Sequence, residues 1–169
     1  MFCLHKYLTV GGNALWANKK AMIVEAQITI NRNKPAVWAA ITNIRHAAEI
    51  ITGVQKIEIL NEPVNGLVGL KWRETRMYFG KPAAIDKWIT DAIENKFYKT
   101  RAEIDGFIFL TTMTISESGD NIILTSSHET EPQGIIAKIK SLPMIFFRGT
   151  LKKAILKDLN DIKIEVEHK

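Results

Sequence analysis

Cysteine is almost absent from this sequence of 169 residues, since Cys3 is the single example. One cysteine cannot form an internal disulfide, so we expect a protein of the reducing cytoplasm. Long apolar runs are also missing, and no stretch reaches the roughly 18 residues that a membrane-spanning helix needs. Residues 1–21 lack the unbroken apolar segment of a secretion signal. These absences favour a cytoplasmic globular protein.

A strong excess of positive charge is missing as well. The net charge is +5, but residues 1–21 carry three lysines and no acidic residue, so little of the excess belongs to the remainder. A nucleic-acid-binding protein would need lysine and arginine clustered on one face, with aromatic side chains for stacking. The sequence therefore argues against a nucleic-acid partner.

Motifs for cofactors, metals and common hydrolases are absent too. "NGLVG" lacks the phosphate-binding glycine pattern, and there is no G-x-S-x-G segment and no Walker lysine. His5, His46 and His168 are too scattered to form a metal site, and no zinc or paired-carboxylate spacing occurs. We expect no cofactor and no metal.

The first structured part of the chain is expected to be a strand followed by two short helices. "MIVEAQITI", residues 22–30, alternates apolar and polar positions and is rich in β-branched residues. Asn33 is a suitable helix N-cap and Pro35 suits the first turn. A second short helix is expected over residues 44–50. The inner face of the first helix would carry Val37, Trp38 and Ile41.

Six further strands are expected in series. Short turn signals separate most of them, namely "GKP", "EN", "DG" and "SGD", and such short links join antiparallel neighbours. The sequence therefore predicts a curled antiparallel meander. Its strands are "VQKIEIL", "LKWRETRMYFG", "AAIDKWITDAI", "FYKTRAEI", "FIFLTTMTISE" and "NIILTSSHETE".

The last 35 or so residues change to a helical period. Apolar residues recur every three or four positions, which predicts a long amphipathic helix with a kink at Pro143. The fold class is thus α+β, with a curved seven-stranded antiparallel sheet wrapped around a C-terminal helix, as one domain over residues 22–169. Residues 1–21 are expected to be an N-terminal tail outside this fold, or to follow from an upstream start codon. The alternative is an extra strand from "YLTV". The periodic residues are Ile135, Ile139, Leu142, Ile145, Ile155, Leu159, Ile162 and Val166.

Three stretches resemble the START/Bet v 1-like helix-grip superfamily, in particular its bacterial polyketide cyclase/dehydrase-like branch. "ITINRNKPAVWAAITNI" resembles the opening strand and first helix, and "GLVGLKWRETRMYFG" resembles a strand of the pattern W-R-E-T-R-x-x-F-G. "LKDLNDIKIEVE" resembles the end of the terminal helix. The resemblance implies a cavity between sheet and helix that takes a hydrophobic or amphipathic molecule. It leaves the activity open, because the superfamily includes both carriers and enzymes.

The strand over residues 70–79 carries the first candidate ligand-binding residues. Trp72, Glu74, Arg76 and Tyr78 share one face, because side chains alternate along a strand. If that face points inward, Glu74 and Arg76 should pair and could orient a polar ligand head. A structural ion pair fits equally well, and an outward face would make them a solvated pair of little energetic weight.

The remaining candidates lie on later strands. Trp88 could stand near Trp72 across a hairpin and sandwich a planar ring, although plain core packing would place both residues similarly. His128 could act as a general base, or be a hydrogen-bonded strand histidine. Three others could form the pocket wall or solid core. These are Tyr98, Phe109 and Met113.

The sequence supports two functions, of which the first is preferred. The first is binding of a lipid, polyketide or aromatic compound without catalysis. The alternative is a cyclase/dehydratase-type enzyme in which Arg76 polarises a carbonyl group and His128 or Glu74 moves a proton. A third interpretation is transient contact with a membrane surface through "MIFF", residues 144–147, although packing of this segment against the two short helices is favoured. Either a monomer or a homodimer is compatible with the sequence.

Overall fold

The computed structural model describes residues 22–78, 80–134, 136 and 147–168. One antiparallel sheet of seven strands dominates it, in the order β1-β7-β6-β5-β4-β3-β2. The predicted meander is confirmed, and the first strand extends it at one edge by pairing with the last. The strands are β1 (Met22–Ile30), β2 (Val54–Asn61), β3 (Lys71–Tyr78), β4 (Lys81–Ile93), β5 (Phe97–Ile104), β6 (Phe107–Ser118) and β7 (Asn121–Pro132).

The two short helices follow β1 as expected. The Asn33 side chain accepts a hydrogen bond of 3.0 Å from the Ala36 amide, which caps the free N–H groups at the start of α1 (Lys34–Thr42). Pro35 fits this first turn because its missing N–H would have no partner there. A 3₁₀ turn, η1 (Ile44–His46), then leads into α2 (Ala47–Ile50).

The link between β5 and β6 shows why the strands fold back so tightly. Asp105 and Gly106 have φ angles of 50° and 79°, the left-handed values that a two-residue hairpin turn requires. Glycine adopts this conformation freely, and aspartate is among the residues that tolerate it best. The "DG" signal in the sequence therefore fixes the position of this turn.

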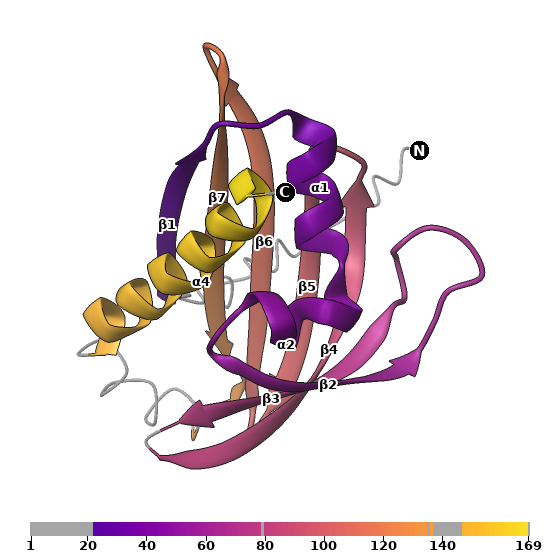
Figure 1. Cartoon of the computed structure of the whole chain (residues 1–169). Coiled ribbons are helices and arrows are strands. Elements are labelled where there is room, and N and C mark those ends of the chain that lie inside the picture. The colour runs from indigo at the N-terminus through magenta and orange to yellow at the C-terminus, as the bar shows by residue number, and fades with distance from the viewer. Residues whose placement is uncertain (1–21, 79, 135, 137–146, 169) are drawn as a thin grey trace, which may run out of the picture.

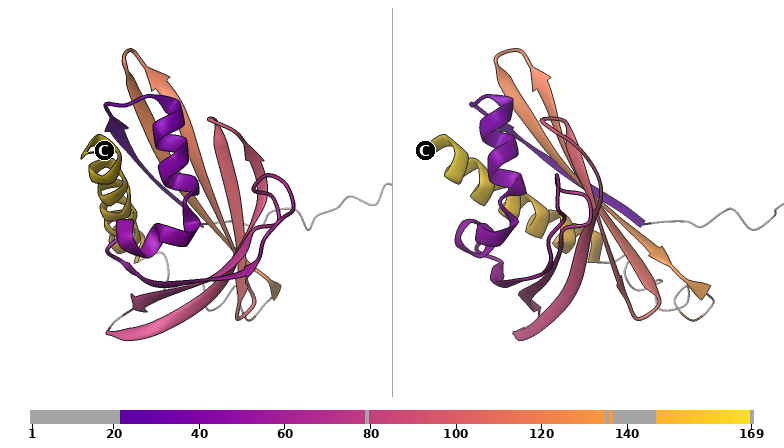
Figure 2. Two further views of the ribbon diagram at one scale, coloured as in Figure 1. Left: turned by 45° about the vertical axis from the view of Figure 1, so that its right-hand side comes forward. Right: turned by 90° about the vertical axis from the view of Figure 1, so that its right-hand side faces the viewer.

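The helices lie together on the concave face of the curved sheet (Figures 1 and 2). The terminal helix α4 (Arg148–His168) packs along β1, and the α1–η1–α2 segment lies beside it. The far end of α4 is tied back to the end of β1, because Arg32 Nε donates to the Val166 carbonyl over 3.0 Å. The apolar stripe of α4 is buried against the sheet, as its periodicity predicts: Ile155, Leu159, Ile162 and Val166.

Several expectations fall outside the described residues. These are the N-terminal tail over residues 1–21, the kink at Pro143, and all of "MIFF" except Phe147. Within the described part of the chain, no helix combines the length and apolar character that crossing a membrane demands.

Candidate functional site

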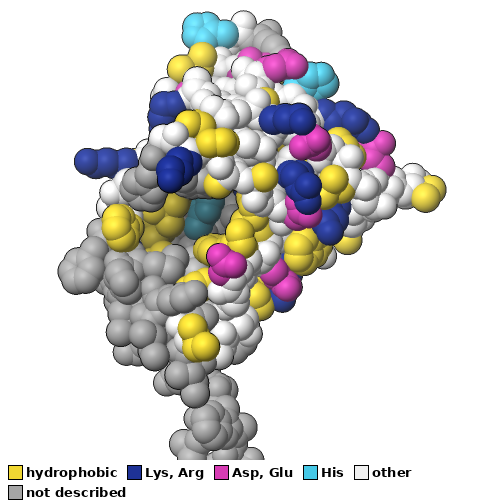
Figure 3. Space-filling model, turned by 90° about the horizontal axis from the view of Figure 1, so that it is seen from below, with side chains coloured by type: hydrophobic (Ala, Val, Ile, Leu, Met, Phe, Trp, Pro, Cys, Tyr) yellow, Lys and Arg dark blue, Asp and Glu magenta, His cyan; other side chains and the backbone are white. Residues whose placement is uncertain are grey.

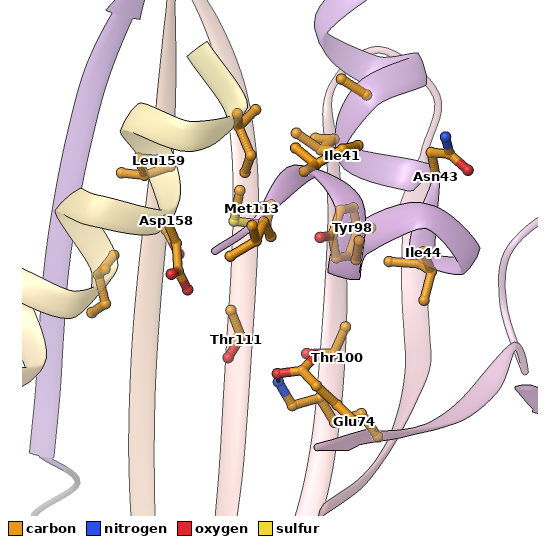
Figure 4. Close-up of a pocket in the computed structure, with 18 of the residues that line it drawn as sticks. Ile41, Asn43, Ile44, Glu74, Tyr98, Thr100, Thr111, Met113, Asp158 and Leu159 are labelled. Carbon is orange, nitrogen blue, oxygen red and sulfur yellow. Dashed lines mark hydrogen bonds and ion pairs between the residues drawn. The ribbon is translucent and has the colours of Figure 1, made fainter. Parts of the chain in front are cut away.

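Two cavities lie between the concave face of the sheet and the helices. The upper cavity, about 110 Å³, sits beneath the short helices and beside α4, with Ile41, Tyr98, Met113 and Leu159 among the side chains that point toward it (Figure 4). The lower cavity, about 440 Å³, lies near the beginnings of β4 and α4. Seen from below, the molecule is hollowed among apolar side chains (Figure 3).

The two cavities meet at a set of mainly polar side chains, here called the boundary cluster. Strands β3 to β7 contribute most of its members, and α4 contributes the others. Each member lines both cavities, so a molecule in either one would contact the cluster. The members are Arg76, Lys87, Thr100, Thr111, His128, Ile155 and Asp158.

Strand β3 directs Trp72, Glu74 and Arg76 toward the helices. Trp72 and Glu74 are 3 % and 6 % exposed, so this face is inside the molecule. Tyr78 ends β3 opposite Lys81, and its side chain is outside the described part of the structure. Strand β3 thus places a carboxylate and a guanidinium within the fold.

Glu74 is held by three donors. Arg76 Nε lies 2.5 Å and Lys87 Nζ 2.7 Å from Glu74 Oε1, and Trp72 Nε1 lies 3.4 Å from Oε2. Burial alone would raise the pKa of Glu74, but the charges and hydrogen bonds of Lys87 and Arg76 outweigh it and lower the pKa to about 2. Glu74 is therefore ionised at neutral pH and makes a poor general acid or base.

Arg76 joins β3 to α4. Its Nη1 donates to Asp158 Oδ2 over 2.7 Å while its Nε is bound to Glu74. Burial opposes the charge of Arg76, yet the two carboxylates raise its pKa above the ordinary value. At Asp158 burial is the stronger influence and raises the pKa, against the opposing effect of Arg76. The Arg76–Asp158 ion pair spans the space between sheet and helix.

His128 is half-buried beside this ion pair on β7. Its Nε2 is 2.9 Å from Ser126 Oγ and its Nδ1 is 3.3 Å from Thr111 Oγ1. Burial, followed by the positive charges of Lys87 and Arg76, lowers the pKa of His128 to about 4. The ring is therefore neutral at physiological pH, and it is a weak base.

Trp88 does not join this site, and the predicted sandwich with Trp72 is wrong. The hairpin register pairs Trp72 with Lys87 and Lys71 with Trp88, and directly paired residues share a face. Trp88 therefore lies on the outer face, where Lys71 Nζ is 5.8 Å from its ring centroid. Lys87 occupies the inward position that we had expected for an aromatic ring.

The other aromatic and methionine candidates line the cavities. Tyr98 and Met113, which pair across β5 and β6, line the upper cavity, whereas Phe109 lines the lower one. Burial and the nearby charge of Glu74 raise the pKa of Tyr98, so its hydroxyl group keeps its proton. Tyr98 also packs edge-on against Trp38 with 6.3 Å between ring centroids.

Metal binding finds no support in the described residues. They contain no group of three or more histidine, cysteine, aspartate or glutamate side chains that could hold a metal ion. The two carboxylates that point into the cavities, Glu74 and Asp158, are already bound to cationic side chains.

Comparison with known proteins gave no matching family model and no matching curated protein. Solved structures do match over most of the chain. An aromatase/cyclase from Streptomyces has a TM-score of 0.72 at 16% identity, covering 88% of this chain and 94% of its own. A START superfamily protein from Mycobacterium smegmatis has a TM-score of 0.72 at 13% identity, with 86% and 97% covered. The chain has the helix-grip fold of START and Bet v 1-like proteins.

A third solved structure that matches is a synthase. Truncated norcoclaurine synthase from Thalictrum flavum has a TM-score of 0.66 at 18% identity, covering 88% of this chain and 96% of its own. At identities this low, the structural matches establish the shared fold alone. The chemistry has to be argued from the cavity itself.

Sequence reasoning missed two charged residues of the boundary cluster, Lys87 and Asp158. Both left a signal in the sequence. Asp158 falls on the apolar stripe of its helix, between Ile155 and Leu159, where a carboxylate needs a partner. Lys87 alternates with Trp88, so identifying the outward residue would have identified the inward one.

Proposed function

We propose that this helix-grip protein binds a hydrophobic or amphipathic small molecule between its sheet and α4. The lower cavity carries the proposal: at about 440 Å³ it falls within the ~300–1,000 Å³ typical of small-molecule sites. Its apolar wall includes Ala102, Phe109, Leu151 and Ile155. An apolar wall with a few polar groups at one end suits an amphipathic ligand.

The boundary cluster supports placing the polar end of the ligand inside. It lies between the two cavities, so a ligand whose body fills the lower cavity would bring its head group against Thr100, Thr111 and His128. The upper cavity, at about 110 Å³, is too small for a whole ligand of ordinary size but has room for ordered water or the tip of a head group.

The test is native mass spectrometry of the gently purified protein, followed by solvent extraction and a matched blocking variant. Ala154 lines the lower cavity and is exposed, so Ala154→Trp should fill the cavity without disrupting the core. Ala39 is an exposed α1 residue that lines neither cavity, and Ala39→Trp is the control.

We expect an extra mass of a few hundred daltons that is lost on denaturation, and a higher melting temperature when the extracted compound is added back. Both effects should persist in Ala39→Trp and disappear in Ala154→Trp. If no hydrophobic compound raises the melting temperature of the wild-type protein, the proposal fails.

A cyclase/dehydratase-type enzyme is the second candidate, because His128 lines both cavities beside Arg76 and Lys87. Two features favour binding over this chemistry. The lowered pKa of His128 weakens it as a general base, and Arg76 is already bound to Glu74 and Asp158. Turnover that is abolished by His128→Ala in a folded protein would support the enzyme instead.

A further inference from the structure

The charges that line the cavities balance one another. Among the described residues, the upper cavity is lined by two cationic side chains, Arg76 and Lys87, and by two carboxylates, Glu74 and Asp158. The lower cavity is lined by the same two cations and by Asp158, and the Glu74 carboxylate that binds both cations lies directly beside them. Glu129 also borders the lower cavity, but it follows His128 on β7, so its side chain points to the opposite face of the sheet. The charged groups that face inward are therefore two cations and two carboxylates, which balance.

The balance is made by direct contacts. Glu74 is bound by Arg76 at 2.5 Å and by Lys87 at 2.7 Å, and Asp158 is bound by Arg76 at 2.7 Å. Inside a protein, a charged group is tolerated only when an opposite charge and hydrogen bonds replace its lost hydration. A ligand that brought its own charge to this point would have to break an existing pair or remain unpaired.

Uncharged hydrogen-bonding groups are available at the same place. In the part of the chain that the structure describes, the hydroxyl groups of Thr100 and Tyr98 have no hydrogen-bond partner, although both residues are buried. His128 is neutral, because burial and the nearby cations lower its pKa to about 4. A ligand hydroxyl or carbonyl group could bind these side chains without disturbing the ion pairs.

We propose that the ligand is an uncharged amphiphile, with a hydroxyl or carbonyl head group at the boundary cluster and its apolar body in the lower cavity. This inference rests on the proposed function and adds the chemical class of the ligand. The four charged residues of the upper cavity then act as a specificity device: they orient a neutral head group and reject charged ones.

On this proposal, removing one charged side chain of the cavity should change which ligands the protein prefers. Asp158→Asn keeps the shape of the side chain but leaves one surplus positive charge, which should favour a carboxylate ligand. Lys87→Met leaves one surplus negative charge, which should favour an ammonium ligand. Arg73 and Asp86 provide matched controls. They form an ion pair of 2.7 Å between β3 and β4, the strands that carry Glu74 and Lys87, but their side chains are 48% and 31% exposed.

The experiment uses N-phenyl-1-naphthylamine, an uncharged fluorescent probe, and competes it with dodecanol, dodecanoate and dodecylammonium at neutral pH. In the wild-type protein we expect dodecanol to compete about tenfold or more better than either ion, the ratio that corresponds to part of the cost of burying an unpaired charge. In Asp158→Asn, the advantage of dodecanol over dodecanoate as a competitor should shrink or reverse. In Lys87→Met, the advantage of dodecanol over dodecylammonium should shrink or reverse. Asp86→Asn and Arg73→Met should retain the wild-type order.

The outcomes separate the two proposals. If neither the probe nor any competitor binds, the proposed function itself fails. If the probe binds but an ion competes as well as dodecanol in the wild-type protein, binding stands and the neutral-ligand inference is overturned. This comparison needs no variant, so a substitution that fails to fold does not affect it. Variants that fold and keep the wild-type order would show that the charges do not set selectivity.

Discussion

Arg76 on β3 and Asp158 on α4 lie 82 positions apart in sequence and form an ion pair of 2.7 Å across the interior of the protein. The same guanidinium is fixed from its other side by Glu74, at 2.5 Å. Arg76 therefore stays extended between sheet and helix, at the level where the two cavities meet.

Loss of the Asp158 carboxylate should weaken the fold measurably. Asp158→Ala leaves a largely buried guanidinium with one carboxylate instead of two, and we expect the free energy of unfolding to fall by about 1–3 kcal/mol. The expected loss of unfolding free energy lies between the values for fully buried ion pairs and for surface ion pairs, because the Asp158 side chain is 25% exposed. Urea denaturation measures the change. A double-mutant cycle with Arg76→Met should give a coupling energy of at least about 0.5 kcal/mol, and additive effects would contradict a direct interaction.

The stability of the protein should depend on pH through His128. Its folded-state pKa, about 4, is below its ordinary value of 6.5, so the unfolded chain binds a proton first as the pH falls. The stabilisation is complete above pH 6.5 and is lost as the pH falls toward 4. In His128→Gln, the loss of unfolding free energy over this interval should be smaller by about 2–3 kcal/mol. Urea titrations at several pH values give both curves, and parallel curves would refute the assignment.

Gly53 is expected to be sensitive to substitution, because a side chain there would crowd the Arg76–Asp158 ion pair. A Cβ atom at this position would lie 3.1 Å from Arg76 Nη1 and 3.4 Å from Asp158 Oδ1. Gly53→Val should therefore displace the ion pair and lower the melting temperature more than Gly53→Ala does. In an Asp158→Ala background the penalty for Gly53→Val should be clearly smaller, because one of the crowded groups is gone. An equal penalty in both backgrounds would point to the backbone instead.

Trp72 and Trp88 should respond differently to the same substitution. Trp72→Ala empties a buried position and is expected to cost about 3–5 kcal/mol. Trp88→Ala removes an outer-face contact with Lys71, and should cost about 1 kcal/mol and leave binding of N-phenyl-1-naphthylamine unchanged. Denaturation and probe titration test both statements. A Trp88→Ala protein that folds but no longer binds the probe would contradict the outward placement.

The fold was predictable because its signals are local. The alternation of β1, the Asn33 cap and the "DG" turn each determine a short segment, and short turns between successive strands permit little besides an antiparallel meander. The pairing of β1 with β7 is not local. It joins strands at opposite ends of the sheet's sequence order, and no short-range signal in the sequence specifies it.

The site was predictable only in part because it depends on hairpin register. Alternation correctly grouped Trp72, Glu74 and Arg76, but one residue of register decides whether Lys87 or Trp88 shares their face. Asp158 reaches the same point from a distant helix, so its pairing with Arg76 follows from tertiary packing alone. A charged residue on an apolar helix face is the signal that would have identified it.

The pairing of β1 with β7 also bears on how the chain folds. Met22 lies opposite Thr130 and Ile30 opposite Ile122, so β1 must wait for a strand made about a hundred residues later. The hairpins from β2 to β7 can form early from near neighbours, whereas closing this long loop is entropically costly and slow. During synthesis β1 would therefore remain unpaired until β7 has left the ribosome. Met22 of β1 lines the lower cavity, so the late pairing of β1 would also add the last part of its wall, and a ligand bound there would favour the assembled protein over earlier intermediates.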